Sequence, residues 1–242
     1  MGRNLPAMRD SLHGSFPTRR RAGDGAISMS DENTRARRLL MINGQLRTSD
    51  VNDRDLLAAF AAVPRENFVA APLRELAYGD GDILSSGPPG RKLLSPRTLG
   101  LMLKAATPVA GERALTVGAG AGYCAALLAA LGLEVVALET DSSAARAAGL
   151  AGVECVDGPL TQPPAGKGTF DVIVINGAFE VAPERLLAAL SAKGRLLGLS
   201  ARSSAKKTVI FERSGDGVSE RSLEDAPGDV LPGFARAPAF AF

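Results

Sequence analysis

A glycine-rich turn between two apolar runs constrains the fold of this chain most. The run "ALTV" is followed by "GAGAGY", by the alanine- and leucine-rich stretch "CAALLAAL", and then by "EVVALE". Glycines directly after a strand allow the unusual backbone angles with which a strand turns into a helix. The stretch therefore predicts a strand, a tight loop, a helix and a second strand, with the two strands parallel.

The same alternation continues toward the C-terminus. The apolar runs "VECVDG", "FDVIVING" and "GRLLGLS" alternate with the helical stretches "DSSAARAAG" and "PERLLAALSA". Continuously apolar strands are typical of a parallel sheet that is covered by helices on both faces. The segment "KKTVIFERSGDGVSERSLED" then indicates two strands joined by a turn. We predict an α/β, Rossmann-like sheet that is mostly parallel and ends in an antiparallel hairpin.

The chain divides into three predicted parts. Residues 1–32 are rich in Arg, Gly and Ser without periodicity, so we expect a disordered tail. Residues 33–106 form a helical and loop portion, in which helical spacing breaks at "RTSDVND" and Ser49 or Asp50 is the candidate cap of a second helix. Residues 107–242 contain the sheet. Met29 and Met41 leave the true start of the protein open.

Composition excludes several classes of function. The net charge of +2 is too small to indicate a nucleic-acid or membrane partner. His13 is the only histidine, so we expect no metal site and no Ser-His-Asp triad in the main domain. No uncharged apolar run is long enough to span a membrane. The two cysteines, in no CxxC pattern, suit a reducing cytoplasm, where we expect the protein.

The glycine loop predicts a ligand that contains ribose. Gly118, Gly120 and Gly122 precede a helix whose first N–H groups face the ligand. Glu139 ends the next strand about twenty residues later, where a carboxylate can accept from both ribose hydroxyls. The third glycine comes one place too early for NAD, and the terminal hairpin also disfavours an NAD-linked enzyme. The GxGxG spacing suits S-adenosylmethionine better.

Five segments together resemble one known family. They are "LLAAFAAVPRENFV", "LAYGDGDI", "LTVGAGAGYCAALLA", "VDG" and "FDVIVINGAFEVAPERLLAALSAKGRLLG". Between residues 41 and 211 the chain resembles protein-L-isoaspartate O-methyltransferases. The resemblance implies a small N-terminal helical portion ahead of a methyltransferase sheet.

The resemblance also implies an activity. It is the S-adenosylmethionine-dependent methylation of the stray α-carboxylate in isoaspartyl residues of damaged proteins, a protein-repair reaction in which the ester then collapses to a succinimide. The residues expected to hold the cofactor are Gly118, Ala119, Gly120, Gly122, Glu139, Asp157 and Gly158. For Asp157, which follows the third strand, a turn residue is the equal alternative to an adenine contact.

The substrate loop departs from the family pattern. The family's loop resembles G-Q-T-I-S-Q-P, whereas this chain has "GRKLLSP", with Leu94 at the serine position and Lys92 at the threonine position. Ser95 is the candidate catalytic donor, or alternatively the N-cap of the helix that begins at Pro96. Lys92 or Arg91 either pairs with a substrate carboxylate or is a solvated loop charge.

Two further positions leave the function open. Thr116 replaces the acidic residue that such enzymes usually carry two places before the first glycine. Asn176 either contacts cofactor or substrate, or caps a strand end, and we place it with Lys92 and Leu94 at the substrate site. The alternative to the repair enzyme is therefore a relative with another acceptor, or a non-catalytic nucleotide-binding or interaction protein. Oligomeric state stays open, and the C-terminal "VLPGFARAPAFAF" either packs on the domain or forms a partner surface.

Overall fold

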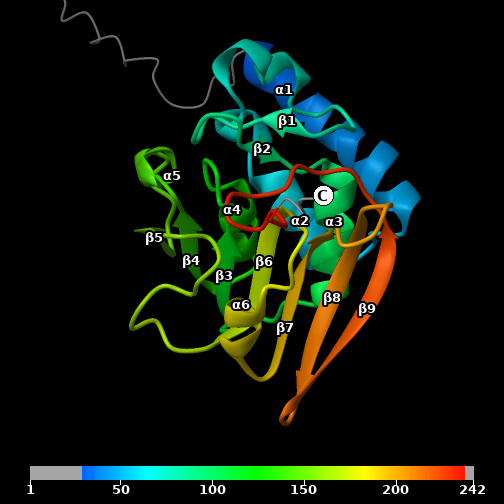
Figure 1. The fold of residues 1–242 in the computed structure, drawn as a ribbon. Coiled ribbons are helices and arrows are strands. Elements are labelled where there is room, and N and C mark those ends of the chain that lie inside the picture. The colour runs from blue at the N-terminus through cyan, green and yellow to red at the C-terminus, as the bar shows by residue number, and fades with distance from the viewer. Residues whose placement is uncertain (1–28, 238–242) are drawn as a thin grey trace, which may run out of the picture.

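The structure is a computed structural model that describes residues 29–237, with side chains from residue 32. Its centre is a seven-stranded sheet with the strand order β5-β4-β3-β6-β7-β8-β9 (Figure 1). Strands β3 to β7 run parallel to one another, and β8 and β9 form an antiparallel hairpin that is joined to β7, as predicted. The bounds are β3 Arg113–Val117, β4 Glu134–Glu139, β5 Val153–Asp157, β6 Phe170–Phe179, β7 Leu190–Ser200, β8 Lys207–Ser214 and β9 Gly217–Asp225.

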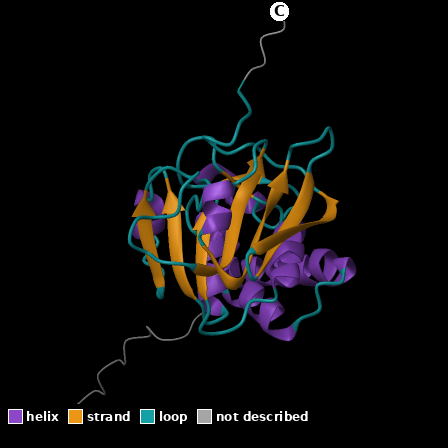
Figure 2. Cartoon of the chain, turned by 60° about the horizontal axis from the view of Figure 1, so that its bottom comes forward, coloured by secondary structure: helices purple, strands orange, loops and turns teal. Residues whose placement is uncertain are grey.

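The apolar strands supply two cores, one on each face of the sheet. In β4, Val135 and Ala137 enter one core while Val136 and Leu138 enter the other, because successive side chains of a strand point to opposite faces. Figure 2 shows helices packed against the twisted layer of strands. The first core is covered by α2, α3 and α4, and the second by α6 and the C-terminal segment. These helices span α2 Arg54–Ala62, α3 Pro96–Ala106, α4 Tyr123–Ala130 and α6 Glu184–Ala188; α5 is Ser143–Ala147.

The N-terminal portion differs in detail from the prediction. Helix α1, Met29–Met41, continues through the π-helical turn Ile42–Leu46 and the 3-10 turn Arg47–Ser49. Asp50 then adopts a left-handed conformation with φ 61° and ends the helix. The cap of α2 is Asp53, which accepts from the Leu56 N–H at 2.8 Å, so the expected cap at Ser49 or Asp50 is wrong. The boundary expected at residue 32 falls inside α1, and residues 1–28 of the expected tail lie outside the described residues.

Two segments cross the edge of the sheet where the parallel strands end (Figure 1). Strands β1, Ile83–Leu84, and β2, Lys92–Leu93, form a small antiparallel hairpin after the 3-10 turns Arg65–Phe68 and Ala71–Leu76. We call residues 85–91, which join these strands, the hairpin loop. Residues 226–234 form the C-terminal strap.

The C-terminal strap lies beside the end of β6. The Ala178 N–H donates to the Asp229 carbonyl at 2.8 Å, and the Leu231 N–H donates to the Ala178 carbonyl at 2.9 Å. Ala178 keeps its place in the β6–β7 register opposite Leu199 and also forms a parallel bridge to Val230 of the strap. Residues 230–234 of the apolar C-terminus therefore pack on the domain, whereas residues 238–242 lie outside the described part.

Candidate functional site

The topology places the site at the carboxyl ends of β3 and β4. Strand β3 lies between β4 and β6, so the strand order reverses beside it. In open parallel sheets, ligands bind outside the carboxyl ends of the strands at such a switch point. The glycine loop follows β3 directly, and Gly118, Gly120 and Gly122 have φ angles of 68°, 59° and 98°. Glycine is needed here because these angles are unfavourable for other residues.

Glu139 lies beside this loop with no exposed side-chain surface. Its carboxylate accepts hydrogen bonds from the Gly120 N–H at 2.9 Å and from the Thr140 N–H at 2.8 Å. Burial by itself raises the pKa of Glu139, but the Arg91 guanidinium and these two N–H groups outweigh it and hold the pKa below its ordinary value. Glu139 is therefore a buried anion at the end of β4.

Arg91 of the hairpin loop forms a bidentate ion pair with Glu139. Its Nε donates to Oε2 and its Nη2 donates to Oε1, both at 2.8 Å. Only 9% of the Arg91 side chain is exposed. The structure thus places Arg91 on the protein's own carboxylate, which differs from both expected roles, the substrate contact and the solvated charge.

The hairpin loop also contacts the backbone of the glycine loop. Ser85 Oγ accepts from the Ala121 N–H at 3.0 Å and from the Gly87 N–H at 3.1 Å. A Cβ added to Gly87 would lie 2.5 Å from the Gly120 carbonyl carbon, so only glycine allows this approach. The sequence reasoning missed Ser85 and Gly87, which precede the "GRKLLSP" stretch.

The C-terminal strap covers the start of the glycine loop. A Cβ added to Gly118 would lie 2.8 Å from Cδ1 of Leu231, whose own side chain is buried. Lys92, at the end of the hairpin loop, pairs with Asp229 of the strap at 2.9 Å. The loop and the strap therefore meet over the same site.

The expected substrate residues line one small cavity. Lys92, Leu94 and Asn176 surround a cavity of about 10 Å³ together with Gly118 and Ala119. Leu94 and Asn176 are buried, and the Asn176 amide donates to the Val117 carbonyl at 3.3 Å. The structure thus brings the expected cofactor and substrate residues together, but a pocket for a small-molecule ligand usually measures about 300–1,000 Å³.

Ser95 is the N-cap of α3, which is the alternative that the sequence offered for it. Its Oγ accepts from the Thr98 N–H at 3.1 Å and donates to the Thr98 hydroxyl at 2.9 Å, in the first turn of α3. Its own N–H donates to Asp82 at 2.7 Å, and the side chain is buried. A direct catalytic role for Ser95 stays a prediction.

Asp157 and Gly158 lie next to Glu139 at the same sheet edge. Glu139 pairs with Asp157 in the sheet register, and the Gly158 N–H donates to the Glu139 carbonyl at 2.9 Å. The half-exposed Asp157 carboxylate accepts from the N–H of Ser142 and pairs with Arg146 at 2.7 Å. The Ser142 N–H, followed by Arg146, lowers the pKa of Asp157 to about 2.

Three buried polar side chains surround the site without complete hydrogen bonding. Among the described residues, Thr116 Oγ1, Tyr123 Oη and Arg65 Nη1 make no hydrogen bond of normal geometry, although Arg65 and Tyr123 interact electrostatically with each other. Arg65 is fully buried, lies over the Tyr123 ring and donates to the Leu94 carbonyl at 2.8 Å. The sequence motif "VPRENFV" contained Arg65, but nothing in it indicated a buried cation.

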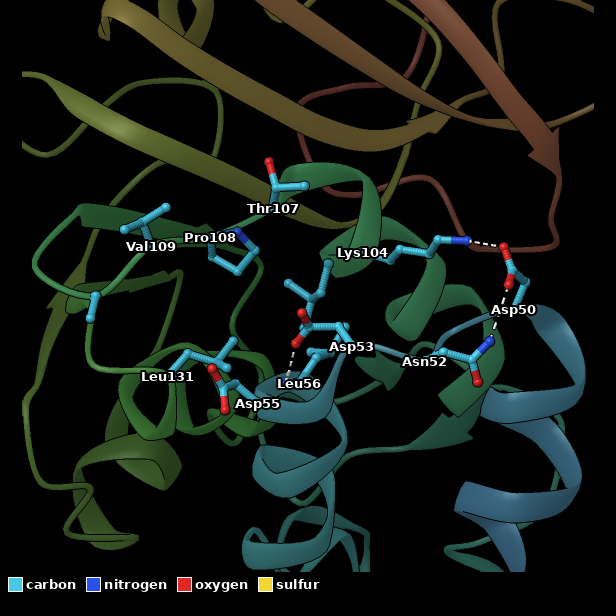
Figure 3. A pocket seen from close by; sticks show the side chains of 12 residues that line it. Asp50, Asn52, Asp53, Asp55, Leu56, Lys104, Thr107, Pro108, Val109 and Leu131 are labelled. Carbon is cyan, nitrogen blue, oxygen red and sulfur yellow. Dashed lines mark hydrogen bonds and ion pairs between the residues drawn. The ribbon is translucent and has the colours of Figure 1, made fainter.

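A much larger cavity lies at the opposite edge of the sheet. It measures about 680 Å³ and is lined by residues that precede β3 and β4, including Pro108, Val109 and Leu131. Two of its three acidic side chains, which Figure 3 shows, have structural roles, since Asp53 caps α2 and Asp50 pairs with Lys104. Because it lies at the amino ends of the strands, we do not assign the ligand site to it.

The carboxylate and the glycines at this loop suit a nucleotide. The cavity beside them is too small to hold one in this conformation. A buried carboxylate at the end of β4 and three glycines with positive φ are what a ribose-bearing ligand needs. The side chains of Arg91, Ser85 and Leu231 fill the adjoining space. Within the described residues, no three His, Cys, Asp or Glu side chains are grouped to hold a metal, and none of the helices has the length and hydropathy of a membrane span.

Comparison with known sequences finds one family. The family model described as Protein-L-isoaspartate(D-aspartate) O-methyltransferase matches residues 37–225. A protein-L-isoaspartate O-methyltransferase of Methylorubrum extorquens is 37% identical over 168 residues, which are 66% of this chain and 72% of that protein. Protein-L-isoaspartate O-methyltransferase 2 of Rhodopseudomonas palustris is 34% identical over 200 residues, which are 79% of this chain and 91% of that protein.

Solved structures have the same fold. One protein-L-isoaspartate O-methyltransferase superposes with a TM-score of 0.70 at 22% identity, over 81% of this chain and 66% of that chain. A Plasmodium falciparum protein described under the same name, in complex with S-adenosyl-L-homocysteine, gives 0.68 at 20% identity, over 81% of this chain and 97% of that chain. At these identities the likeness shows the Rossmann-like methyltransferase fold.

Proposed function

This chain belongs to the protein-L-isoaspartate O-methyltransferase family, and from that premise we propose that it is an S-adenosylmethionine-dependent protein carboxyl O-methyltransferase acting on isoaspartyl residues. The observation that carries the proposal is the buried Glu139 carboxylate beside the glycine loop at the switch point of the sheet. A buried, hydrogen-bonded anion at this place suits the ribose hydroxyls.

The cofactor residues in this proposal follow one edge of the sheet. Glu139 holds the ribose, and the backbone of the glycine loop lies against the rest of the ligand. Asp157 pairs with Glu139 in the sheet register, the Gly158 N–H donates to the Glu139 carbonyl, and we propose that both residues face the adenine. The full set is Gly118, Ala119, Gly120, Gly122, Glu139, Asp157 and Gly158.

The proposed reaction suits a site without histidine. When bound, S-adenosylmethionine supplies a methyl group on a positively charged sulfur. The acceptor carboxylate, with an ordinary pKa of about 4, is already an anion at neutral pH, so no side chain has to remove a proton. The work of this chain is then to orient the carboxylate and to exclude water. Buried Leu94 and Leu231 supply the apolar surroundings.

The acceptor side of the site is proposed around the small cavity. Lys92 offers a positive charge to the substrate carboxylate, and Asn176 offers amide donors. Ser95 is retained as the candidate hydroxyl donor, although its hydrogen bonds lie within α3 in this structure. Damaged proteins that carry isoaspartate are the proposed partners. Two cysteines without a disulfide, Cys124 and Cys155, support a reducing compartment such as the cytoplasm.

Transfer of labelled methyl from S-adenosylmethionine to an isoaspartyl peptide tests this function. The matching aspartyl peptide is the control, and an active family member is the positive control. We expect base-labile label on the isoaspartyl peptide alone. Absence of label, while the positive control is methylated, would contradict the proposal.

A second candidate is a relative with another acceptor or without catalysis. It is favoured by Leu94 at the family's serine position and by Thr116, whose buried hydroxyl has no partner among the described residues. The two candidates differ in ligand response, because a ligand of the native state must raise the melting temperature. Absence of stabilisation by S-adenosylhomocysteine would favour an interaction role. One that it stabilises without methylating isoaspartate has another acceptor.

A further inference from the structure

We infer that the hairpin loop is a gate over the cofactor site and that Arg91 is its latch. The inference rests on the proposed function, because it concerns the site assigned to S-adenosylmethionine. In this closed state the Arg91 guanidinium takes the place of the ribose hydroxyls on Glu139. Cofactor binding then requires that Arg91 leave Glu139 and that the hairpin loop lift from the glycine loop.

The Glu139 carboxylate already accepts its full number of hydrogen bonds. Oε2 accepts from Arg91 Nε and from the Gly120 N–H. Oε1 accepts from Arg91 Nη2 and from both the N–H and the hydroxyl of Thr140. A carboxylate oxygen offers about two lone-pair sites, so both oxygens are fully used. Within the described part of the chain, Arg91 is the one side chain that holds a site on each of the two oxygens, so both ribose hydroxyls can bind this carboxylate only after Arg91 has left it.

The hairpin loop also packs directly against the glycine loop. Gly87 lies against the Gly120 backbone so closely that a Cβ would be 2.5 Å from its carbonyl carbon. Ser85 Oγ accepts a hydrogen bond from the Ala121 N–H, which is one of the backbone donors that the glycine loop offers to a ligand. Moving the Arg91 side chain alone would leave both contacts in place, so the whole loop has to move.

The ion pair of Arg91 with Glu139 is the main interaction that stabilises the closed loop. The other ion pair, between Lys92 and Asp229, leaves 40% and 61% of the two side chains exposed. Exposed ion pairs contribute little, whereas a buried bidentate pair is costly to break. Removing Arg91 should therefore raise the population of the open state. Because the apparent dissociation constant is the intrinsic one divided by the competent fraction, affinity should rise with it.

Calorimetric titration with S-adenosylhomocysteine tests the latch. We expect Arg91→Ala to bind at least about tenfold more tightly than wild type, since the competent fraction increases. The matched control is Arg97→Ala, which removes the same side chain from an exposed ion pair with Glu224. Its affinity should equal that of wild type.

A second variant tests the gate without altering the ion pair. Gly87→Ala places a methyl group against the Gly120 backbone, which cannot yield, and φ of Gly87 is not in the left-handed region. Gly81→Ala is the control, because nothing lies within 4 Å of its Cβ position. We expect Gly87→Ala alone to bind S-adenosylhomocysteine more tightly and to speed hydrogen exchange at the Ala121 N–H.

The outcomes separate the gate from the proposed function. If wild type binds and neither Arg91→Ala nor Gly87→Ala binds more tightly, the gate is wrong and the function is untouched. If neither wild type nor these folded variants bind S-adenosylhomocysteine, the proposed function fails, and the gate fails with it. If Arg91→Ala does not fold, Gly87→Ala still decides the gate.

Discussion

At the scale of single residues, Glu139 is the group on which the site depends. The sequence predicts its place, because an acidic residue at the end of an apolar strand is a local pattern. It does not predict Arg91 as the partner, which lies 48 positions earlier and is brought near by the hairpin loop. Such a pairing depends on long-range packing, and the sequence between Arg91 and Glu139 has no periodic pattern that predicts it.

Glu139→Ala should destabilise the protein and weaken cofactor binding. The variant leaves the buried Arg91 guanidinium unpaired, and removing one partner of a buried pair costs about 3–5 kcal/mol in the free energy of unfolding. Denaturant titration measures this cost, and calorimetry with S-adenosylhomocysteine measures the binding. Glu134→Ala, at the exposed start of the same strand, is the control. Equal stability of the two variants, or unchanged affinity in Glu139→Ala, would sink the assignment.

Asp157 should make a contribution to the stability of the protein that depends on pH. Its folded-state pKa of about 2 lies below the ordinary value of an aspartate, about 3.9, because the Ser142 N–H and Arg146 favour the anion. The contribution is therefore present above about pH 4 and is lost as the pH falls toward 2. Melting temperatures of wild type and Asp157→Asn should converge over this range. A constant difference between pH 4 and pH 2 would contradict the account.

At the scale of elements, local signals predicted the sheet well and the N-terminal portion less well. Strand β4 has the predicted bounds, Glu134–Glu139, because an apolar run between turn residues is a clear pattern. Helix α6 is shorter than expected, since the chain enters β7 at Leu190 although "PERLLAALSA" has helical spacing. Here the pairing of Leu190 with Phe170 of β6 outweighs local propensity. The cap at Asp53 was missed because three neighbouring residues, Ser49, Asp50 and Asp53, are all good caps.

Ser95→Ala should destabilise α3. The Ser95 hydroxyl bonds the Thr98 N–H at the helix start, and losing such a cap costs about 1 kcal/mol. Denaturant titration should show this loss, with Ser143→Ala as the control, because Ser143 is the exposed first residue of α5 and the N-cap position belongs to Ser142. The same Ser95 variant tests the donor role, since kcat/KM per folded molecule falls only if the hydroxyl also acts on the substrate. No change in stability would contradict the cap.

At the scale of the whole molecule, the fold follows from alternation along the chain, but the closure of the site does not. The fold required only the order of strands and helices, which is readable from hydropathy. The closure joins the hairpin loop, the glycine loop and the C-terminal strap, which are far apart in the sequence. They meet because two connections cross the carboxyl edge of one sheet, which only the three-dimensional structure reveals.

The crystal structure of the protein with saturating S-adenosylhomocysteine tests the central claim most directly. The account predicts the ligand between the glycine loop and β4, with its ribose on the Glu139 carboxylate and the Arg91 guanidinium moved away from it. The hairpin loop should then no longer contact the Gly120 backbone. A structure in which Arg91 stays paired with Glu139, while the site beside the glycine loop holds no ligand, would contradict it.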